Sequence, residues 1–167
     1  MSKFVVRPLD AATWPDFARL VEKHDGVWGG CWCMEFHPEG GERSSLRREW
    51  KQARVHDGRA HAALVYDGSD CVGWCQFGPT YQLPRIKRQR AYAAGATEPP
   101  DWRITCFFVD KDHRRRGVAA ATLNVFEQHG FERQRPIGKH HWVVSKVIPA
   151  STAPASGGAR DSPACRR

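Results

Sequence analysis

The chain has 167 residues, of which 41% are hydrophobic, enough for one domain with one core. Its 26 lysines and arginines outnumber 18 acidic residues, and the formal net charge of +8 favours phosphorylated or polyanionic partners. The sequence has no long apolar run and no signal-peptide core, so we expect a cytoplasmic protein without membrane segments whose six cysteines are reduced.

The first predicted elements are a strand and a helix. Residues 3–8 have the composition of a strand that ends at Pro8. Thr13 followed by Asp16 matches a capping box, with a proline inside the first turn, and Gly26 ends the helix. Its apolar residues recur at helical spacing and should face the core: Trp14, Phe17, Leu20 and Val21.

Residues 26–42, GVWGGCWCMEFHPEGGE, form a long loop rich in glycine and aromatic residues, a type that often forms the wall or lid of a binding site. Cys31, Cys33 and His37 raise the alternative of a metal site. Their spacing is not that of a zinc knuckle and four ligands are not evident, so we expect no metal and buried thiols beside tryptophan.

A second helix is predicted over residues 44–57, with Leu46, Trp50 and Ala53 on its buried face and its basic residues in solvent. Gly58 ends it.

Two strands, 60–67 and 71–78, follow and form a hairpin across a turn that begins at Asp67. The period-two rule places Cys71 and Cys75 on one face of the second strand.

Residues 79–100 contain four prolines and a basic run from Arg85 to Arg90. We interpret this segment as a solvated loop with a short helix. An acidic acceptor, a coenzyme phosphate or a nucleic acid remain alternative partners for the basic run.

The central motif is RITCFFVDKDHRRRGVAA, residues 103–120. An apolar strand, 104–109, passes through a polar turn and three arginines into a helix expected over 116–129, with Gly130 as its C-cap. The amides at a helix N-terminus and the positive end of its dipole face one point, and arginines add charge, so this turn predicts a phosphate site.

This motif resembles the coenzyme signature of the GCN5-related N-acetyltransferases, the GNAT superfamily. In that family a strand ends in a valine, and Arg/Gln-x-x-Gly-x-Gly/Ala then opens a helix; here Val109, Arg114, Gly117 and Ala119 match without a gap. The resemblance implies an α/β (α+β) single domain, a mixed, mostly antiparallel sheet flanked by helices. It also implies acetyl-CoA as cosubstrate, held by Phe107, Phe108, Val109, Arg114, Arg115, Arg116, Gly117, Val118, Ala119 and Ala120.

The resemblance covers roughly residues 3–146, but with a departure. Residues 126–131 resemble the end of a later family helix, yet lie within the predicted coenzyme helix, so one strand and one helix between them lack counterparts. Residues 139–146 form a last strand. We expect a GNAT-like domain over 1–148 and a disordered tail over 149–167, which is rich in Ser, Ala, Pro and Gly.

The implied chemistry is acyl transfer from a thioester to an amine. A base must deprotonate the amine, and its candidates are Glu35, His37 and Glu98. A backbone N–H of Phe107–Val109 would stabilise the thioester oxygen. Family members commonly protonate the leaving thiolate with a tyrosine; the matching Phe126 has no hydroxyl, so no general acid is assigned.

Two smaller alternatives concern neighbouring residues. Cys106 on the coenzyme strand could form an acyl-cysteine, but a buried thiol is favoured. His129 is expected to interact with the helix C-terminus.

The resemblance therefore implies an N-acetyltransferase that moves an acetyl group from acetyl-CoA to a primary amine of a small molecule or peptide by direct attack. The WGGCWCM loop resembles a segment of a poorly characterised branch of the superfamily and should lie on the acceptor side. The alternative is a catalytically impaired CoA-binding or protein-interaction relative. No membrane partner is expected, nucleic acid ranks last, and a homodimer is left open.

Overall fold

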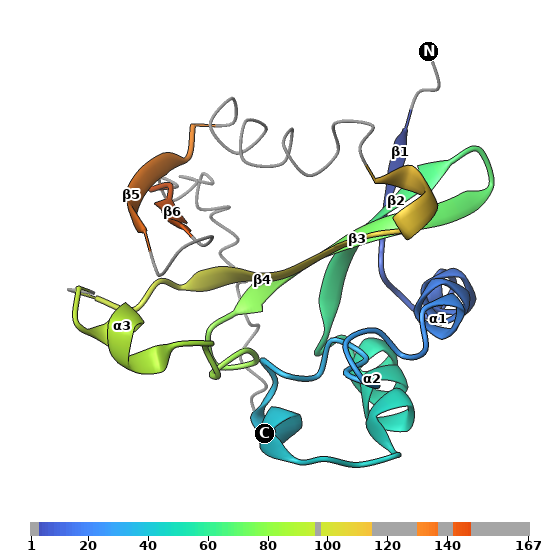
Figure 1. Ribbon diagram of the computed structural model, residues 1–167, viewed down its shortest axis with the longest axis horizontal. Coiled ribbons are helices and arrows are strands. Elements are labelled where there is room, and N and C mark those ends of the chain that lie inside the picture. Colours follow the sequence, from blue (N-terminus) through green and yellow to red (C-terminus); the bar gives the residue numbers. More distant parts are fainter. Residues whose placement is uncertain (1–3, 96–97, 115–129, 137–141, 148–167) are drawn as a thin grey trace, which may run out of the picture.

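The computed structural model describes residues 4–95, 98–114, 130–136 and 142–147 (Figure 1). A four-stranded sheet forms its centre, in the order β1-β2-β3-β4, and every neighbouring pair is antiparallel. The strands are β1 (Val5–Pro8), β2 (His61–Asp67), β3 (Asp70–Pro79) and β4 (Trp102–Val109). The predicted strands and the β2–β3 hairpin are therefore confirmed.

Two helices, α1 (Trp14–Lys23) and α2 (Arg47–His56), cover one face of this sheet (Figure 1). Phe17 of α1 is fully buried and meets the Trp74 ring edge-on at 5.0 Å. Trp74 in turn stacks on Phe108 of β4 at 4.4 Å. The core thus joins α1 through β3 to β4, and burying each such side chain contributes about 1.5–3 kcal/mol.

The start of α1 differs from the predicted capping box. The Asp10 carboxylate, not the Thr13 hydroxyl, accepts from the first amides, those of Ala12 and Thr13, each at 2.9 Å. Thr13 Oγ1 instead donates to the Pro8 carbonyl at 2.7 Å. The prediction was wrong because Asp10 forms a turn one step earlier, which leaves the Thr13 hydroxyl to tie α1 to the end of β1.

The buried face of α2 was also predicted wrongly. Leu46 is 52% exposed and Ala53 is exposed, whereas Lys51 is fully buried and Arg54 nearly so. Trp50 packs only partly against the core. Arg54 can be buried because its guanidinium donates twice to the Glu39 carboxylate, at 2.6 and 2.8 Å.

Two bulges interrupt the sheet. Val72 is an extra residue of β3, because Cys71 pairs with Tyr66 and Gly73 with Val65. This shift puts Cys71 in the core and Cys75 on the other face, so the expectation that they share a face was wrong. Thr105 is the extra residue of β4, since Cys106 pairs with Gln76 and Ile104 with Phe77.

The remaining described elements are short. They are the 3-10 turns Pro38–Gly41 (η1) and Lys111–His113 (η2), the helix α3 (Gln89–Ala93), and the separate hairpin β5 (Glu132–Pro136) and β6 (Trp142–Ser145). The segment 26–42 is a loop that ends in η1, and 79–100 is a loop containing α3, as predicted. β6 agrees with the predicted last strand.

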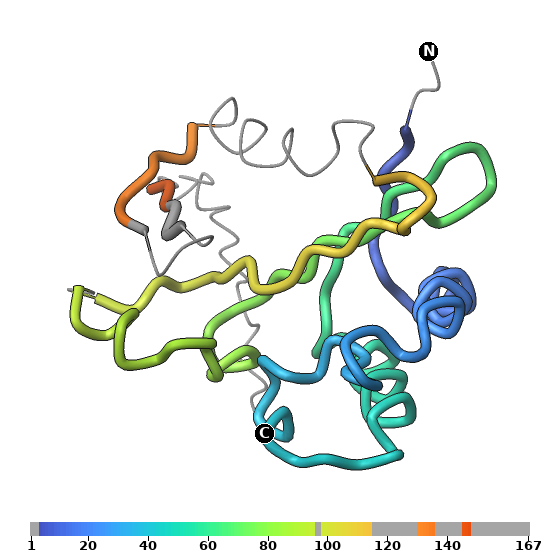
Figure 2. The backbone as a smooth tube through the Cα atoms, in the orientation of Figure 1, coloured from blue at the N-terminus to red at the C-terminus, as the bar shows by residue number. Residues whose placement is uncertain are grey.

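The β5–β6 hairpin and α3 lie at the same end of the molecule, near the start of β4 (Figure 2). Arg135 of β5 donates to the carbonyls of Ala91, at 2.9 Å, and Tyr92. The sequence did not predict β5, because its residues are almost all polar.

Several expectations fall outside the described residues: the helix over 116–129, the tail over 149–167, and hence the division at 148. None of the helices in the described part of the chain is long and apolar enough to span a membrane.

Candidate coenzyme site

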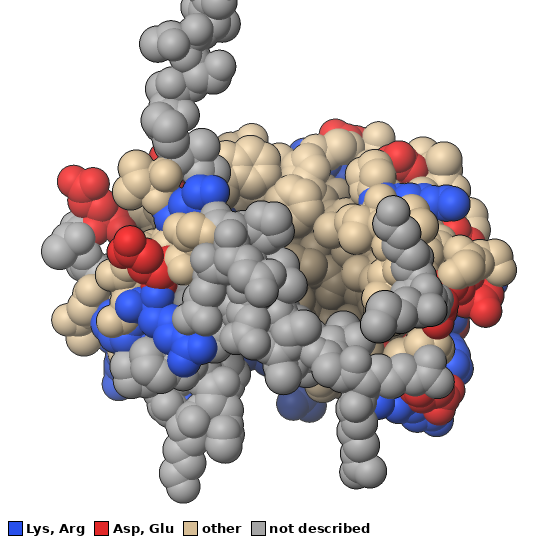
Figure 3. All heavy atoms as spheres, turned by 90° about the horizontal axis from the view of Figure 1, so that it is seen from above, with Lys and Arg blue, Asp and Glu red and all other residues tan. Residues whose placement is uncertain are grey.

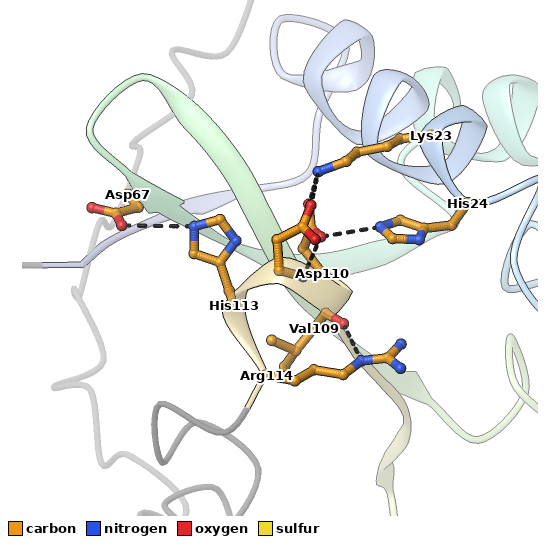
Figure 4. A network of polar contacts seen from close by, with 8 residues as sticks. Lys23, His24, Asp67, Val109, Asp110, His113 and Arg114 are labelled. Carbon is orange, nitrogen blue, oxygen red and sulfur yellow. Dashed lines mark hydrogen bonds and ion pairs between the residues drawn. The ribbon is translucent and has the colours of Figure 1, made fainter.

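At the end of β4, the backbone N–H and C=O groups of one residue point away from the neighbouring strand β3. The amide of Asp110 donates to the Val72 carbonyl at 2.8 Å, which continues the pairing with β3. Because neighbouring residues of a strand point their N–H and C=O groups to opposite sides, those of Val109 point away from β3. Accordingly the Val109 carbonyl accepts from Arg114 Nε, at 3.1 Å (Figure 4). No strand among the described residues pairs with this second edge of β4.

Asp110 fixes the turn that follows. Its buried carboxylate accepts from Lys23 Nζ at 2.7 Å and from the Asp112 amide at 3.0 Å, and lies 3.4 Å from His24 Nε2 (Figure 4). Burial alone would raise the pKa of Asp110, but the hydrogen bonds from Lys23 and Asp112 lower it below its usual value. The contact with Asp110 raises the pKa of Lys23 to about 12. The turn is thereby tied to the end of α1.

The amides nearest to β4 serve the turn itself. His113 donates to the Asp110 carbonyl at 2.9 Å, and Arg114 donates to the Lys111 carbonyl at 3.4 Å. An anion held by backbone amides would therefore use those that follow Arg114.

The structure describes four of the ten predicted coenzyme residues: Phe107, Phe108, Val109 and Arg114. Phe108 is buried in the core, Phe107 is 41% exposed on the sheet face away from α1, and Val109 is half-buried. The other six lie outside the described residues: Arg115, Arg116, Gly117, Val118, Ala119 and Ala120.

A small apolar pocket of about 110 Å³ lies beside β4, on the sheet face away from α1 and α2. Figure 3 looks onto this face and shows uncharged residues around a central hollow. The pocket is lined by Phe4, Val65, Val72, Gly73, Trp74, Cys75, Phe107, Phe108, Val109 and His113. The exposed phenylalanine of the coenzyme strand thus belongs to an apolar wall.

The candidate bases lie apart from one another. Glu98 is exposed, and Glu35 lines a second pocket of about 320 Å³ with Arg85 and Lys87. His37 is 1% exposed, and burial, together with the charges of Lys51 and Arg54, lowers its pKa to about 2. A buried neutral imidazole cannot take a proton directly from a substrate, so the structure removes His37 as a direct base.

The residues considered for a metal site also separate. Cys33 Sγ lies 3.0 Å from Cys106 Sγ and accepts from Trp74 Nε1 at 3.0 Å, whereas His37 faces Gln82 and Lys51. Within the described ranges, no three histidine, cysteine, aspartate or glutamate residues are arranged to hold a metal ion. The expected burial of Cys31, Cys33 and Cys106 is confirmed.

Sequence reasoning missed a buried polar chain that ends on β4. Lys51 Nζ donates to Gln76 Oε1 at 2.5 Å and lies 3.3 Å from His37 Nε2. His37 Nδ1 lies 3.1 Å from the Gln82 carbonyl, and Gln76 Nε2 donates to Thr105 Oγ1 at 3.2 Å. The available signal was Gln76, a polar residue within the otherwise apolar run of β3.

Comparison with solved structures finds similar folds at low sequence identity. The ribosomal-protein-alanine N-acetyltransferase of Brucella melitensis biovar Abortus 2308 is 14% identical, with a TM-score of 0.44 over 75% of this chain and 70% of the other. A GCN5-related N-acetyltransferase of Ralstonia eutropha JMP134 is 17% identical, with a TM-score of 0.40 over 76% and 75%. Arabidopsis thaliana NAA60, solved in complex with acetyl-CoA, is 17% identical, with a TM-score of 0.37 over 76% and 69%.

A search of curated proteins finds no match. The sequence profile described as "Acetyltransferase (GNAT) family" matches residues 18–147, which include the second half of α1, all of α2, the four-stranded sheet except β1, and both strands of the hairpin. The match extends over more than half of the chain, and the antiparallel sheet with helices on one face agrees with it. The chain therefore belongs to the GNAT family of acetyltransferases.

Proposed function

We propose that this protein is an N-acetyltransferase that transfers the acetyl group of acetyl-CoA to a primary amine of a small molecule or peptide. The observation that carries the proposal is the end of β4, where the backbone of Val109 points away from β3 and a basic segment begins directly after the turn. Family membership makes this segment the place to expect the coenzyme.

The residues fit the chemistry of acetyl-CoA. Extended backbone at Phe107–Val109 offers hydrogen-bonding groups to the amide-containing pantetheine arm. The backbone amides that follow Arg114, as far as Ala120, would offer donors to the pyrophosphate, and the three arginines would offer positive charge. Acetyl-CoA supplies the activated acyl group.

In the reaction the protein would bind and orient the two substrates, stabilise the negative charge on the thioester oxygen and accept the proton of the amine. The neutral amine attacks the thioester carbonyl, the new C–N bond forms as the C–S bond breaks, and the thiolate leaves. Backbone N–H groups of the Phe107–Val109 segment would stabilise the negative charge on the oxygen. The amine's proton would pass to an exposed acceptor, for which Glu35 and Glu98 remain the candidates.

The alternative is a relative that binds CoA without efficient turnover. Two observations favour it: Phe126 stands where the family's acid carries a hydroxyl, and His37 is sealed in the core. Binding of CoA by the protein, with no acetylation of any amine tested, would establish this alternative.

Calorimetric titration with acetyl-CoA tests the proposal. We expect binding by the parent, no binding by Gly117→Trp, and unchanged binding by Leu46→Trp, which introduces the same side chain at the exposed residue before α2. A thiol-release assay over a panel of amines then measures turnover. Absence of binding by the folded parent would overturn the proposed function.

A further inference from the structure

In the hydrogen-bonded chain that runs from the 26–42 loop to β4, the donor and the acceptor of each bond can be assigned. The Gln82 carbonyl can only accept, so His37 Nδ1, 3.1 Å away, carries the proton. His37 is neutral at ordinary pH because burial lowers its pKa to about 2, so its Nε2 is an acceptor. Lys51 Nζ, 3.3 Å from that nitrogen, therefore donates to it.

The same logic orients the second half of the chain. Lys51 Nζ also donates to Gln76 Oε1 at 2.5 Å, which fixes the amide so that its nitrogen faces Thr105. That nitrogen has only donors to offer, so Thr105 Oγ1 must accept. The hydroxyl proton of Thr105 consequently points to some other partner. Within the part of the chain that the structure describes, Gln76 is the one hydrogen-bond partner of this hydroxyl.

Thr105 stands at a distinctive place in the sheet. It is the bulged residue of β4, with no partner of its own on β3, and it is half-buried, whereas Lys51, His37 and Gln76 are at most 1% exposed. The hydrogen-bonded chain therefore leads from the sealed core to a half-buried threonine on β4.

The burial of Lys51 argues for a role beyond stability. Its hydrogen-bonding partners are the neutral Gln76 and His37, and no carboxylate pairs with it among the described residues. Burial lowers the pKa of Lys51. Keeping an amine in the core without a carboxylate partner is costly, and an apolar side chain at such a position is often at least as stable.

The position of Thr105 along β4 suggests what it meets. The expected pyrophosphate region follows Val109, and the pantetheine arm would run back along Val109 to Phe107. A ligand extended along this strand reaches Thr105 last, at its acyl end.

We propose that Thr105 donates a hydrogen bond to the acetyl carbonyl oxygen of the acyl donor, and that His37, Lys51 and Gln76 are positioning residues that hold its hydroxyl as a donor. This inference rests on the proposed function. In this proposal Thr105 contacts the substrate, and the other three residues act only by orienting Thr105.

Gln76→Glu provides the decisive variant. A carboxylate at this position keeps an acceptor for Lys51 and gives that buried cation a charged partner, so the free energy of unfolding should not fall. It can no longer donate to Thr105, however, so the hydroxyl turns to donate to the carboxylate. We expect Gln76→Glu and Thr105→Val to bind acetyl-CoA roughly five- to tenfold more weakly, the usual effect of one hydrogen bond.

Desacetyl-CoA, which lacks the acetyl carbonyl, is the control ligand, and its affinity should be unchanged in both variants. Thr105→Ser should retain the parent affinity for acetyl-CoA, and so should Gln52→Glu, which makes the same substitution on the outer part of α2. Calorimetry of both ligands and thermal unfolding of each variant provide the readouts.

The outcomes separate the two proposals. If the parent binds neither ligand, the proposed function fails. If the parent binds acetyl-CoA but Gln76→Glu and Thr105→Val match it, or weaken both ligands equally, the assignment of Thr105 is wrong and the chain is structural.

Discussion

The sulfur atoms of Cys33 and Cys106 lie 3.0 Å apart in the core, although the residues are 73 positions apart in the chain. Burial alone would raise the pKa of Cys33, but the contact with Cys106, the charge of Lys51 and the hydrogen bond that Trp74 Nε1 donates to Cys33 Sγ together lower it. The hydrogen bond to Cys33 and burial raise the pKa of Cys106. Cys33 is therefore the more acidic sulfur of the pair and the one that forms the thiolate.

We expect a peroxide to oxidise Cys33 and Cys106 to a disulfide. The Cys33 thiolate attacks the peroxide, Cys106 displaces the resulting sulfenic oxygen, and the products are a disulfide and water. Mass spectrometry of the non-reduced protein should show the loss of two hydrogen atoms and a peptide linking Cys33 to Cys106. Cys71→Ser should keep this link and Cys33→Ser should abolish it. Linkage of other cysteines in its place would contradict the prediction.

Acid should destabilise the fold through His37. The unfolded chain binds a proton at this imidazole near pH 6.5, whereas the folded chain does so only near pH 2. The stabilisation is complete above pH 6.5 and is lost as the pH falls, by up to about 1.4 kcal/mol per pH unit for this one group.

Urea unfolding between pH 7.5 and 4.5 measures this loss. His37→Gln can donate to Gln82 and accept from Lys51 without titrating, so its free energy of unfolding should fall less steeply over that range. Parallel slopes for the parent and the variant would show that His37 is not the group responsible.

Asp110→Asn should destabilise the protein by about 1–2 kcal/mol, because the charged hydrogen bond with Lys23 is lost at a buried carboxylate. The exposed Asp112 also contacts Lys23, at 2.9 Å, but Asp112→Asn should destabilise the protein less, because solvent screens an exposed ion pair. The lowered pKa of Asp110 makes its contribution present above about pH 4 and lost below. Thermal unfolding of the parent and both variants at pH 7 and pH 3 measures this effect. The stability difference between the parent and Asp110→Asn should be smaller at pH 3 than at pH 7.

Arg135→Ala should loosen the contact between β5 and α3, because the guanidinium donates to the carbonyls of Ala91 and Tyr92. Trypsin should then cleave after Arg90 faster than in the parent. Arg19→Ala, which removes an exposed arginine of α1, should leave the rate unchanged. Equal rates in all three proteins would mean that this contact does not protect α3.

The strands of the sheet could be predicted because each carries a short apolar or alternating run bounded by turn residues. Cys71 and Cys75 show the limit of that reasoning. One inserted residue, Val72, moves every later residue of β3 to the opposite face, and nothing in the sequence marks Val72 as a bulge. β5 was missed for the opposite reason, since ERQRP lacks the apolar residues that identify a strand.

The GNAT-like motif of β4 and the turn after it was recognisable because its residues are contiguous. The chain through His37, Lys51, Gln76 and Thr105 was not, because a loop, a helix and two strands supply one group each. A lysine on a polar helix predicts a solvated face, and only the partners brought by folding show that Lys51 is buried.

The bulge at Thr105 has a consequence for solubility. A long regular edge strand is a template onto which another molecule can add its own strand, and such addition starts aggregation. An extra residue twists the strand and breaks the even spacing of its N–H and C=O groups, so a partner cannot pair along its full length. The irregularity in β4, whose outer edge pairs with no strand among the described residues, therefore discourages edge-to-edge growth of the sheet.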